Sequence, residues 1–204
     1  MSLAIDSLTL DVQDPAAADA FYQAAFGLGA RVRAHGAEAV PSGFRGFSIS
    51  LVVGQPSTVD ALHSSAVEAG ATAVKQPTKG MWGYGSVVED QDGMVWKLAT
   101  SARKEQGPAT RQIDAVVLLL GAADLRASKR FYVERGLAVK RSFPGRYAEF
   151  EPAGGAVTLA LYPGRAGVAK EAGVSAEGDG THGLTAHSRA GSFIDPDGFA
   201  WEPS

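Results

Sequence analysis

Histidine and cysteine, the side chains most typical of metal ligands and catalytic bases or nucleophiles, are scarce in this 204-residue chain. There is no cysteine, which excludes disulfides, thiolate zinc sites and cysteine nucleophiles. The histidines are His35, His63, His182 and His187. The first two are interpreted as a loop residue and an exposed helix residue, and the last two, five positions apart, would point to opposite faces of a strand. Neither a Gly-x-Ser-x-Gly turn, a spacing typical of a catalytic triad, nor a phosphate loop occurs.

One segment is better suited to binding than to catalysis. It is Met81-Trp82-Gly83-Tyr84-Gly85, in which Trp82 and Tyr84 combine large apolar surfaces with polar tips. Such side chains can hold a flat organic ligand. The alternative is that Trp82 covers the core from a loop.

Composition excludes several classes of partner. The net charge is −3, and the basic residues are scattered rather than clustered, so the sequence predicts no nucleic-acid or membrane surface. The longest apolar run, residues 115–120, is too short to span a bilayer, and the first residues do not resemble a secretory signal. We therefore expect a cytoplasmic protein with a small organic ligand, and a homodimer is left open.

The elements that must position these residues occur twice. An opening strand, an Asp followed by Phe-Tyr and Gly-Leu, and an Asp-x-Asp-Gly turn followed by Trp recur at offsets between 105 and 110 residues. They start at Ile5, Asp14 and Asp90 in the first half and at Ile113, Asp124 and Asp195 in the second. Ordered repeats of this kind indicate two tandem domains, residues 1–100 and 112–204, joined by a polar Gly-Pro linker over residues 101–111.

Local patterns predict the same element order in both halves. In the first half, Asp14 is a natural N-cap, with Pro15 at the first helical position. The strands predicted there are residues 4–12, 46–53, 71–75, 84–89 and 95–100, and a second helix is predicted over residues 57–69.

The second half begins in the same way, with a strand over 112–120, a helix over 124–135 and strands over 147–151 and 156–161. Between residues 181 and 192 nothing matches the helix at 57–69, so domain 2 is expected to lack one helix. A helical turn over residues 166–172 is an alternative.

These motifs resemble those of the vicinal-oxygen-chelate superfamily, which includes glyoxalase, bleomycin resistance proteins and extradiol dioxygenases. Its opening pattern is a strand, Asp, a helix with Phe-Tyr, and Gly-Leu; its closing pattern is Asp-Pro-Asp-Gly-aromatic-x-Trp-Glu, closely matched by residues 195–202. The resemblance covers nearly the whole chain. It implies an α+β fold of tandem βαβββ modules, which form cupped mixed sheets with helices on the outer face. This fold serves lyases, dioxygenases and drug-binding proteins, so it does not fix the function.

The resemblance also implies three positions for metal ligands in each half. In the first half these positions hold Ser7, roughly Ser48, and Lys97. None is a usual ligand, and Lys97 would put an ammonium group where a metal ion should lie. We therefore expect no metal in domain 1, with Ser7, Ser48 and Lys97 close together at the floor of its cup.

In the second half the corresponding positions hold Ala115, His182 and Glu202. His182 and Glu202 are the candidate metal ligands of domain 2, and Ala115 leaves the position of the first imidazole empty.

Two functions follow. The first is a metal-free protein that binds or sequesters a drug or metabolite, with Ser7, Ser48, Trp82, Tyr84 and Lys97 as candidate ligand-binding residues and no cofactor. The second is an enzyme: either a metal-dependent lyase or dioxygenase that uses His182 and Glu202, or a metal-free variant with Lys97 or Glu202 as acid or base.

Overall fold

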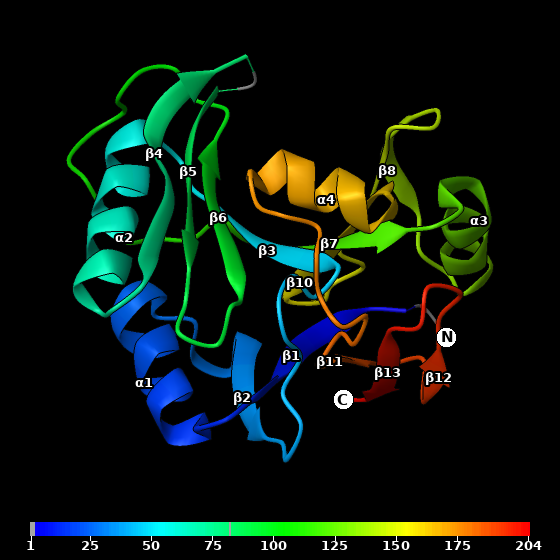
Figure 1. Ribbon diagram of the computed structural model, residues 1–204. Helices are drawn as coiled ribbons and strands as arrows, with labels where there is room; N and C mark the ends of the chain where they lie inside the picture. Colours follow the sequence, from blue (N-terminus) through cyan, green and yellow to red (C-terminus); the bar gives the residue numbers. More distant parts are fainter. Residues whose placement is uncertain (1–2, 82) are drawn as a thin grey trace.

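The computed structural model describes residues 3–81 and 83–204. Within these residues, thirteen strands form one mixed sheet in the order β12-β13-β11-β1-β10-β7-β3-β6-β5-β4, with β2 beside β1 and the β9-β8 hairpin beside β10 (Figure 1). None of the helices in this part of the chain is long and apolar enough to cross a membrane.

The first half contains six strands and two α-helices among its described residues, with a short 3-10 helix, η1 (Gly29–Arg31), before β2. In chain order they are β1 (Ile5–Val12), α1 (Pro15–Phe26), β2 (Val32–Gly36), β3 (Phe47–Val52), α2 (Pro56–Glu68), β4 (Thr72–Gly80), β5 (Gly83–Glu89) and β6 (Val95–Thr100).

The second half contains seven strands and two helices, all within residues 112–204, which are fully described. They are β7 (Ala115–Ala122), α3 (Leu125–Glu134), β8 (Val139–Phe143), β9 (Tyr147–Phe150), β10 (Val157–Pro163), α4 (Gly164–Ala172), β11 (Leu184–Ser188), β12 (Phe193–Ile194) and β13 (Ala200–Pro203).

The strands pair as modules in which the first and last strands are parallel neighbours. Module B is β3-α2-β4-β5-β6, with β3 beside β6, and module C is β7-α3-β8-β9-β10, with β7 beside β10. Module A is the shorter β1-α1-β2, and module D is β11-β12-β13 without a helix. The α+β class and the tandem modules expected from the sequence are confirmed.

The modules associate across the two halves of the chain rather than within each half. β3 of module B pairs antiparallel with β7 of module C, and β1 of module A pairs antiparallel with β11 of module D. A further bridge joins β1 to β10 at Ile5 and Val157. Each pair of modules therefore contains one module from each half.

Each β-sheet face packs against different helices. Val59 and Leu62 of α2 and Tyr132 of α3 pack in the main core, together with β-strand residues such as Trp96 and Leu118. The opposite face, called the inner face below, packs against α4 instead. Figure 1 shows α4 in front of β3 and β7, with α2 and α3 at the two sides. The expectation of helices on the outer face therefore holds for α2 and α3 but is wrong for α4.

Helix α4 also changes the set of helices expected in the second half. Module D has no helix between β11 and β12, whereas β3 of module B is followed directly by α2. The chain instead forms α4 ahead of β11, where the sequence suggested only the alternative of a helical turn. Each half thus has two α-helices among its described residues, so the expectation of one fewer helix in the second half is wrong as a count.

The repeated aspartates explain the motifs from which the repeat was identified. Asp14 and Asp124 cap α1 and α3, each accepting hydrogen bonds from two backbone N–H groups of the first turn. Asp90 accepts from the backbone N–H of Met94 and from the indole N–H of Trp96 at 2.9 Å.

Asp195 does the same in the second half, accepting from the backbone of Phe199 at 2.9 Å, from the indole of Trp201 at 3.4 Å and from the Tyr132 hydroxyl. Both carboxylates are buried. Each closing motif is thus a buried carboxylate that fixes its own turn and a core tryptophan.

Removing either carboxylate should destabilise the protein strongly. Asp90→Ala and Asp195→Ala each leave buried donors without an acceptor, and we expect each variant to lose about 3 kcal/mol of unfolding free energy, measured by urea denaturation. Asp60→Ala is the matched control: its carboxylate accepts an exposed hydrogen bond from Tyr84, and the loss should be about 1 kcal/mol or less. Equal losses in all three variants would contradict this role.

The strand pairing between the halves also predicts a single unfolding transition. Since β3 pairs with β7 and β1 with β11, neither half has a complete sheet alone, so heating should give one calorimetric transition with equal calorimetric and van't Hoff enthalpies. Two separated transitions would mean that the halves unfold independently.

Candidate functional site

The inner face of modules B and C carries a row of side chains in register across four strands. Ser50 of β3 is opposite Lys97 of β6 on one side and Val117 of β7 on the other. Val117 is in turn opposite Thr158 of β10. Neighbouring strands are about 4.8 Å apart, so the row extends over roughly 14 Å. These are the first and last strands of both modules.

A second row lies two residues further along β3, β7 and β10 and extends to β9. Ser48 of β3 pairs with Leu119 of β7, and Ala160 of β10 pairs with Glu149 of β9. The Oγ of Ser48 is buried and has no hydrogen-bond partner among the described residues. Polar groups are therefore buried on a face that also carries the apolar side chains Leu119 and Ala160.

Helix α4 covers this face with small side chains. Its buried residues are Val168, Ala169 and Ala172, which pack with Val117 and Leu119. A fully buried valine contributes about 2 kcal/mol and the alanines less. The helix is therefore held on the inner face by little apolar area.

Charge adds to this contact. The Lys97 ammonium pairs with the Glu171 carboxylate of α4, and their side chains are 14% and 28% exposed. The pair connects β6 with α4 across 74 positions of the sequence.

Two tyrosines and a second carboxylate lie at the other end of the inner face. The rings of Tyr147 and Tyr162 meet edge to face at 5.3 Å. Burial, and secondarily the charge of Glu171, raises the pKa of Tyr162 to about 12. Burial and the charge of Glu149 also raise the pKa of Tyr147 well above its usual value. Both hydroxyls are thus neutral at physiological pH and can act as hydrogen-bond donors.

Glu149 is a buried carboxylate held by cations from the edge strand. Arg141 donates to it at 2.7 Å, Tyr147 at 3.0 Å, and Lys140 lies 2.9 Å away. Burial acts to raise its pKa, but the hydrogen bonds from Arg141, Lys140 and Tyr147 outweigh burial and leave the pKa below its usual value. Glu149 is already saturated with partners, so it is a support of the inner face rather than a free acid or base.

The structure brings together only part of the predicted first-half site. Ser48 and Lys97 lie on the same face of the adjacent strands β3 and β6, but Ser50, not Ser48, is in register with Lys97. Ser7 lies on β1, whose neighbours are β2, β10 and β11, so the expectation that it lies beside Ser48 and Lys97 is wrong. The sequence indicated the correct face of β3, but not the register.

The aromatic segment contributes nothing to the inner face in the residues described. Tyr84 donates a hydrogen bond to Asp60 of α2 at 2.8 Å and packs with the main core, on the opposite side of the sheet. Trp82 lies outside the described residues, so its expected role in binding stays a prediction.

The candidate second-half site is not assembled as expected. His182 stacks on Phe199 at 3.8 Å, and its two ring nitrogens lie 2.7 and 3.2 Å from the backbone oxygens of Arg45 and Asp197. Along the parallel pair of β11 and β13, Glu202 is opposite His187, five residues or roughly 16 Å from His182. His182 therefore connects backbone segments and does not approach Glu202.

The residue that does approach Glu202 is His187, which the sequence analysis set aside. His187 is opposite Ser7 on β1 and Glu202 on β13, and its Nε2 lies 2.8 Å from the Thr9 hydroxyl. The order of the modules could have indicated His187. It lies on β11, the first strand of module D, and the resemblance implied a ligand position on β3, the first strand of module B. Ala115 is on β7, opposite Val52, and takes no part in this group.

The other two histidines also have structural partners. His63 is buried on α2 rather than exposed, and burial lowers its pKa. His35 lies on β2, not in a loop, with its Nδ1 3.0 Å from Asp11. Neither belongs to either group described above.

Neither group fits a divalent metal centre. The row on the inner face offers a lysine, a serine, a valine and a threonine, and its ammonium group opposes a bound cation. The other group offers one imidazole and one carboxylate. Residues 3–81 and 83–204 contain no cluster of three histidine or acidic side chains placed to hold a metal.

The inner face is covered by the buried side chains of α4. A groove of about 520 Å³ lies elsewhere, between α1 and the turn at residues 90–92. It is lined by Asp14, Ala17, Phe21 and Asp92, among others.

Comparison with solved structures places this arrangement among known folds. Glyoxalase I from Zea mays aligns over 98% of this chain and 91% of its own, with a TM-score of 0.65 and 16% identity. A putative dioxygenase from Bacillus subtilis subsp. subtilis str. 168 aligns over 91% of this chain and 70% of its own, with a TM-score of 0.56 and 12% identity. No family model and no curated protein matches the sequence.

At these identities the similarity is one of fold alone. The resemblance noted in the sequence is therefore confirmed for the fold. From its paired modules and its full-length match to glyoxalase I, the chain has the vicinal-oxygen-chelate fold.

Proposed function

We propose that the protein binds a small organic molecule on the inner face of modules B and C, without a metal ion. The row of Lys97, Ser50 and Thr158 would supply polar contacts, and Val117 with the tyrosine pair would supply apolar ones. Small-molecule sites typically combine an apolar lining with a few polar groups of this kind.

The observation that carries this proposal is the burial of Lys97 and Ser48 on one face. Polar groups buried without partners destabilise a fold, and an ammonium group needs a nearby anion. Yet Ser48 has no partner among the described residues, and the partner of Lys97 comes from a lightly packed helix. A binding role accounts for polar groups that folding alone does not require.

The shared fold leaves the reaction open. The similar structures are those of glyoxalase I and a putative dioxygenase, and one fold can serve several activities. We propose, in addition, that the protein is located in the cytoplasm. Within this proposal the activity of the site is the sequestration of a drug or metabolite.

A screen for stabilising ligands tests the proposal. Compounds that raise the melting temperature of the wild-type protein should bind at least about tenfold more weakly to Lys97→Met, because a charged contact contributes about 1.5–3 kcal/mol. The affinity is measured by calorimetry. Lys170→Met, an exposed lysine of α4, is the matched control and should bind like wild type. Ligands whose affinity is unchanged in both Lys97→Met and Ser50→Val would place binding elsewhere.

A second candidate is a metal-dependent enzyme on the face of β1, β11 and β13. It is favoured by one observation: the strand register places His187 beside both Ser7 and Glu202. Catalytic zinc sites normally have three protein ligands, and this face offers one imidazole and one carboxylate.

Metal retention separates the two candidates. We expect the wild-type protein to retain no stoichiometric zinc or manganese after gel filtration in metal-free buffer. Ser7→His adds an imidazole opposite His187 and should gain zinc binding, whereas Ala115→His, on β7, should not. Stoichiometric metal in the wild type that is lost in His187→Ala would favour the enzyme.

A further inference from the structure

The Lys97–Glu171 pair is a charge contact at a position where a ligand would be expected. Lys97 stands in the four-strand row of the inner face, and its ammonium is largely removed from water. A cation in such surroundings requires an anion. In the structure that anion is Glu171, which is not part of the sheet but of the covering helix.

Glu171 fills this position incompletely. One carboxylate oxygen pairs with Lys97, while the other, Oε2, is buried with no hydrogen-bond partner among the described residues. A buried acceptor without a partner lowers stability. The carboxylate is therefore held where it compensates the lysine, at a cost to the helix that carries it.

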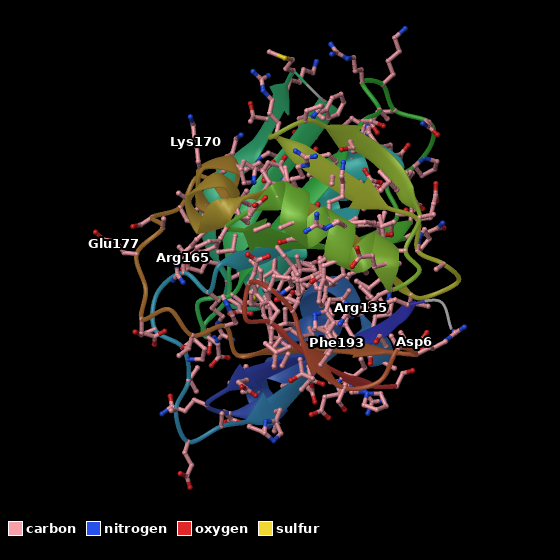
Figure 2. All side chains as sticks on the ribbon, turned by 90° about the vertical axis from the view of Figure 1, so that its right-hand side faces the viewer. Asp6, Arg135, Arg165, Lys170, Glu177 and Phe193 are labelled. Atoms are coloured by element: carbon pink, nitrogen blue, oxygen red, sulfur yellow. The ribbon has the colours of Figure 1, made fainter. Side chains whose placement is uncertain are left out.

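The helix itself is weakly built. It contains Gly164 and Gly167, and glycine is among the residues least favourable to helix formation. Gly164 and Gly173, at its two ends, have φ values of +66° and +80°, in the left-handed region that favours glycine. Figure 2 shows Lys170 of α4 directed outward, away from the molecule. The segment thus has a glycine at each end and is held on the sheet by three small buried side chains and the Glu171 carboxylate.

One further contact holds the helix at its start. Arg165 donates from Nε to the backbone oxygen of Ala176 at 2.8 Å, and its guanidinium lies 5.6 Å from the ring of Phe44. The first contact joins α4 to the segment that follows it, and the second joins the start of α4 to Phe44, in the segment before β3. A movement of residues 168–172 away from the sheet would therefore pivot about this anchored start.

We propose that the inner face holds a binding site for a small organic carboxylate, and that Glu171 occupies its carboxylate position until such a ligand displaces α4. The ligand's carboxylate takes the place of Glu171 on Lys97. Its apolar body lies on the surface that α4 leaves, between Val117, Leu119 and the Tyr147–Tyr162 pair. This inference rests on the proposed function and adds to it the ligand class and the means of control.

The internal carboxylate competes with any ligand, because only molecules in which α4 is displaced can bind it, and the apparent affinity is smaller the smaller that fraction is. Removing the Glu171 charge should therefore strengthen the binding of an external carboxylate. It should also loosen α4 in the free protein.

Benzoate is the test ligand, and benzamide is its uncharged analogue. By calorimetry, Glu171→Gln should bind benzoate at least tenfold more tightly than wild type and should not bind benzamide. Glu171→Gln combined with Lys97→Met should lose this binding, and the combination with Lys97→Arg should keep most of it. Glu177→Gln is the matched control: Glu177 lies in the segment after α4 and is exposed at the edge of the molecule (Figure 2), so benzoate should bind as in wild type.

Hydrogen exchange of the α4 amides supplies the second measurement. Benzoate should increase exchange over residues 168–172 of Glu171→Gln, since the helix leaves the sheet. Gly173→Ala, which strains the seated helix without touching the ion pair, should also increase exchange and benzoate affinity. It replaces Glu171→Gln if that variant does not fold.

The outcomes separate this inference from the proposed function. If benzoate binds in a Lys97-dependent way while the α4 amides stay protected, the displacement of α4 is wrong, but the binding site on the inner face stands. If the α4 amides of Glu171→Gln exchange faster than in wild type but benzoate does not bind, the ligand is not a carboxylate of this kind. The proposed function then fails only if the ligand screen also yields no compound whose binding depends on Lys97. Benzoate binding that is equal in wild type and Glu171→Gln would overturn the role of Glu171.

Discussion

The antiparallel pairing of β3 with β7 is the constraint on which the rest of the structure depends. It aligns Ser50 with Val117, and the parallel neighbours β6 and β10 then extend this row to Lys97 and Thr158. β7 can occupy this central place because it is apolar on both faces, as its sequence predicts. The row therefore combines residues from both halves of the chain, and no half could form it alone.

Local signals account for what the sequence predicted correctly. The capping aspartates, the Asp-x-Asp-Gly turns and their tryptophans each act within a few residues, through hydrogen bonds that the pattern itself specifies. Their repetition at offsets of 105 to 110 residues was enough to indicate two sets of modules and the resemblance to the fold. Short or exposed edge strands such as β2 and β8 have no comparable local signal, and they were not predicted.

Strand register between distant segments explains the errors at the site. Ser48 was chosen on the correct face of β3, but only the pairing with β6 shows that Ser50 faces Lys97. The assignment of His182 failed because His182 lies ahead of β11, whereas the pairing of β11 with β13 brings His187 to Glu202. A shift of two residues keeps the face and loses the partner, and nothing in a single strand's sequence reveals it.

The position of α4 could not be predicted from its own residues, because its glycines and alanines give no strong helical pattern. Its buried side chains and the pair of Glu171 with Lys97 hold it on the sheet. The resemblance in the sequence implied a metal-ligand position at Lys97, and a lysine there would repel a divalent cation and attract a carboxylate. In the proposed function, the lysine that opposes a metal ion is thus the same residue that pairs with Glu171 of the covering helix, so one charge relates both features.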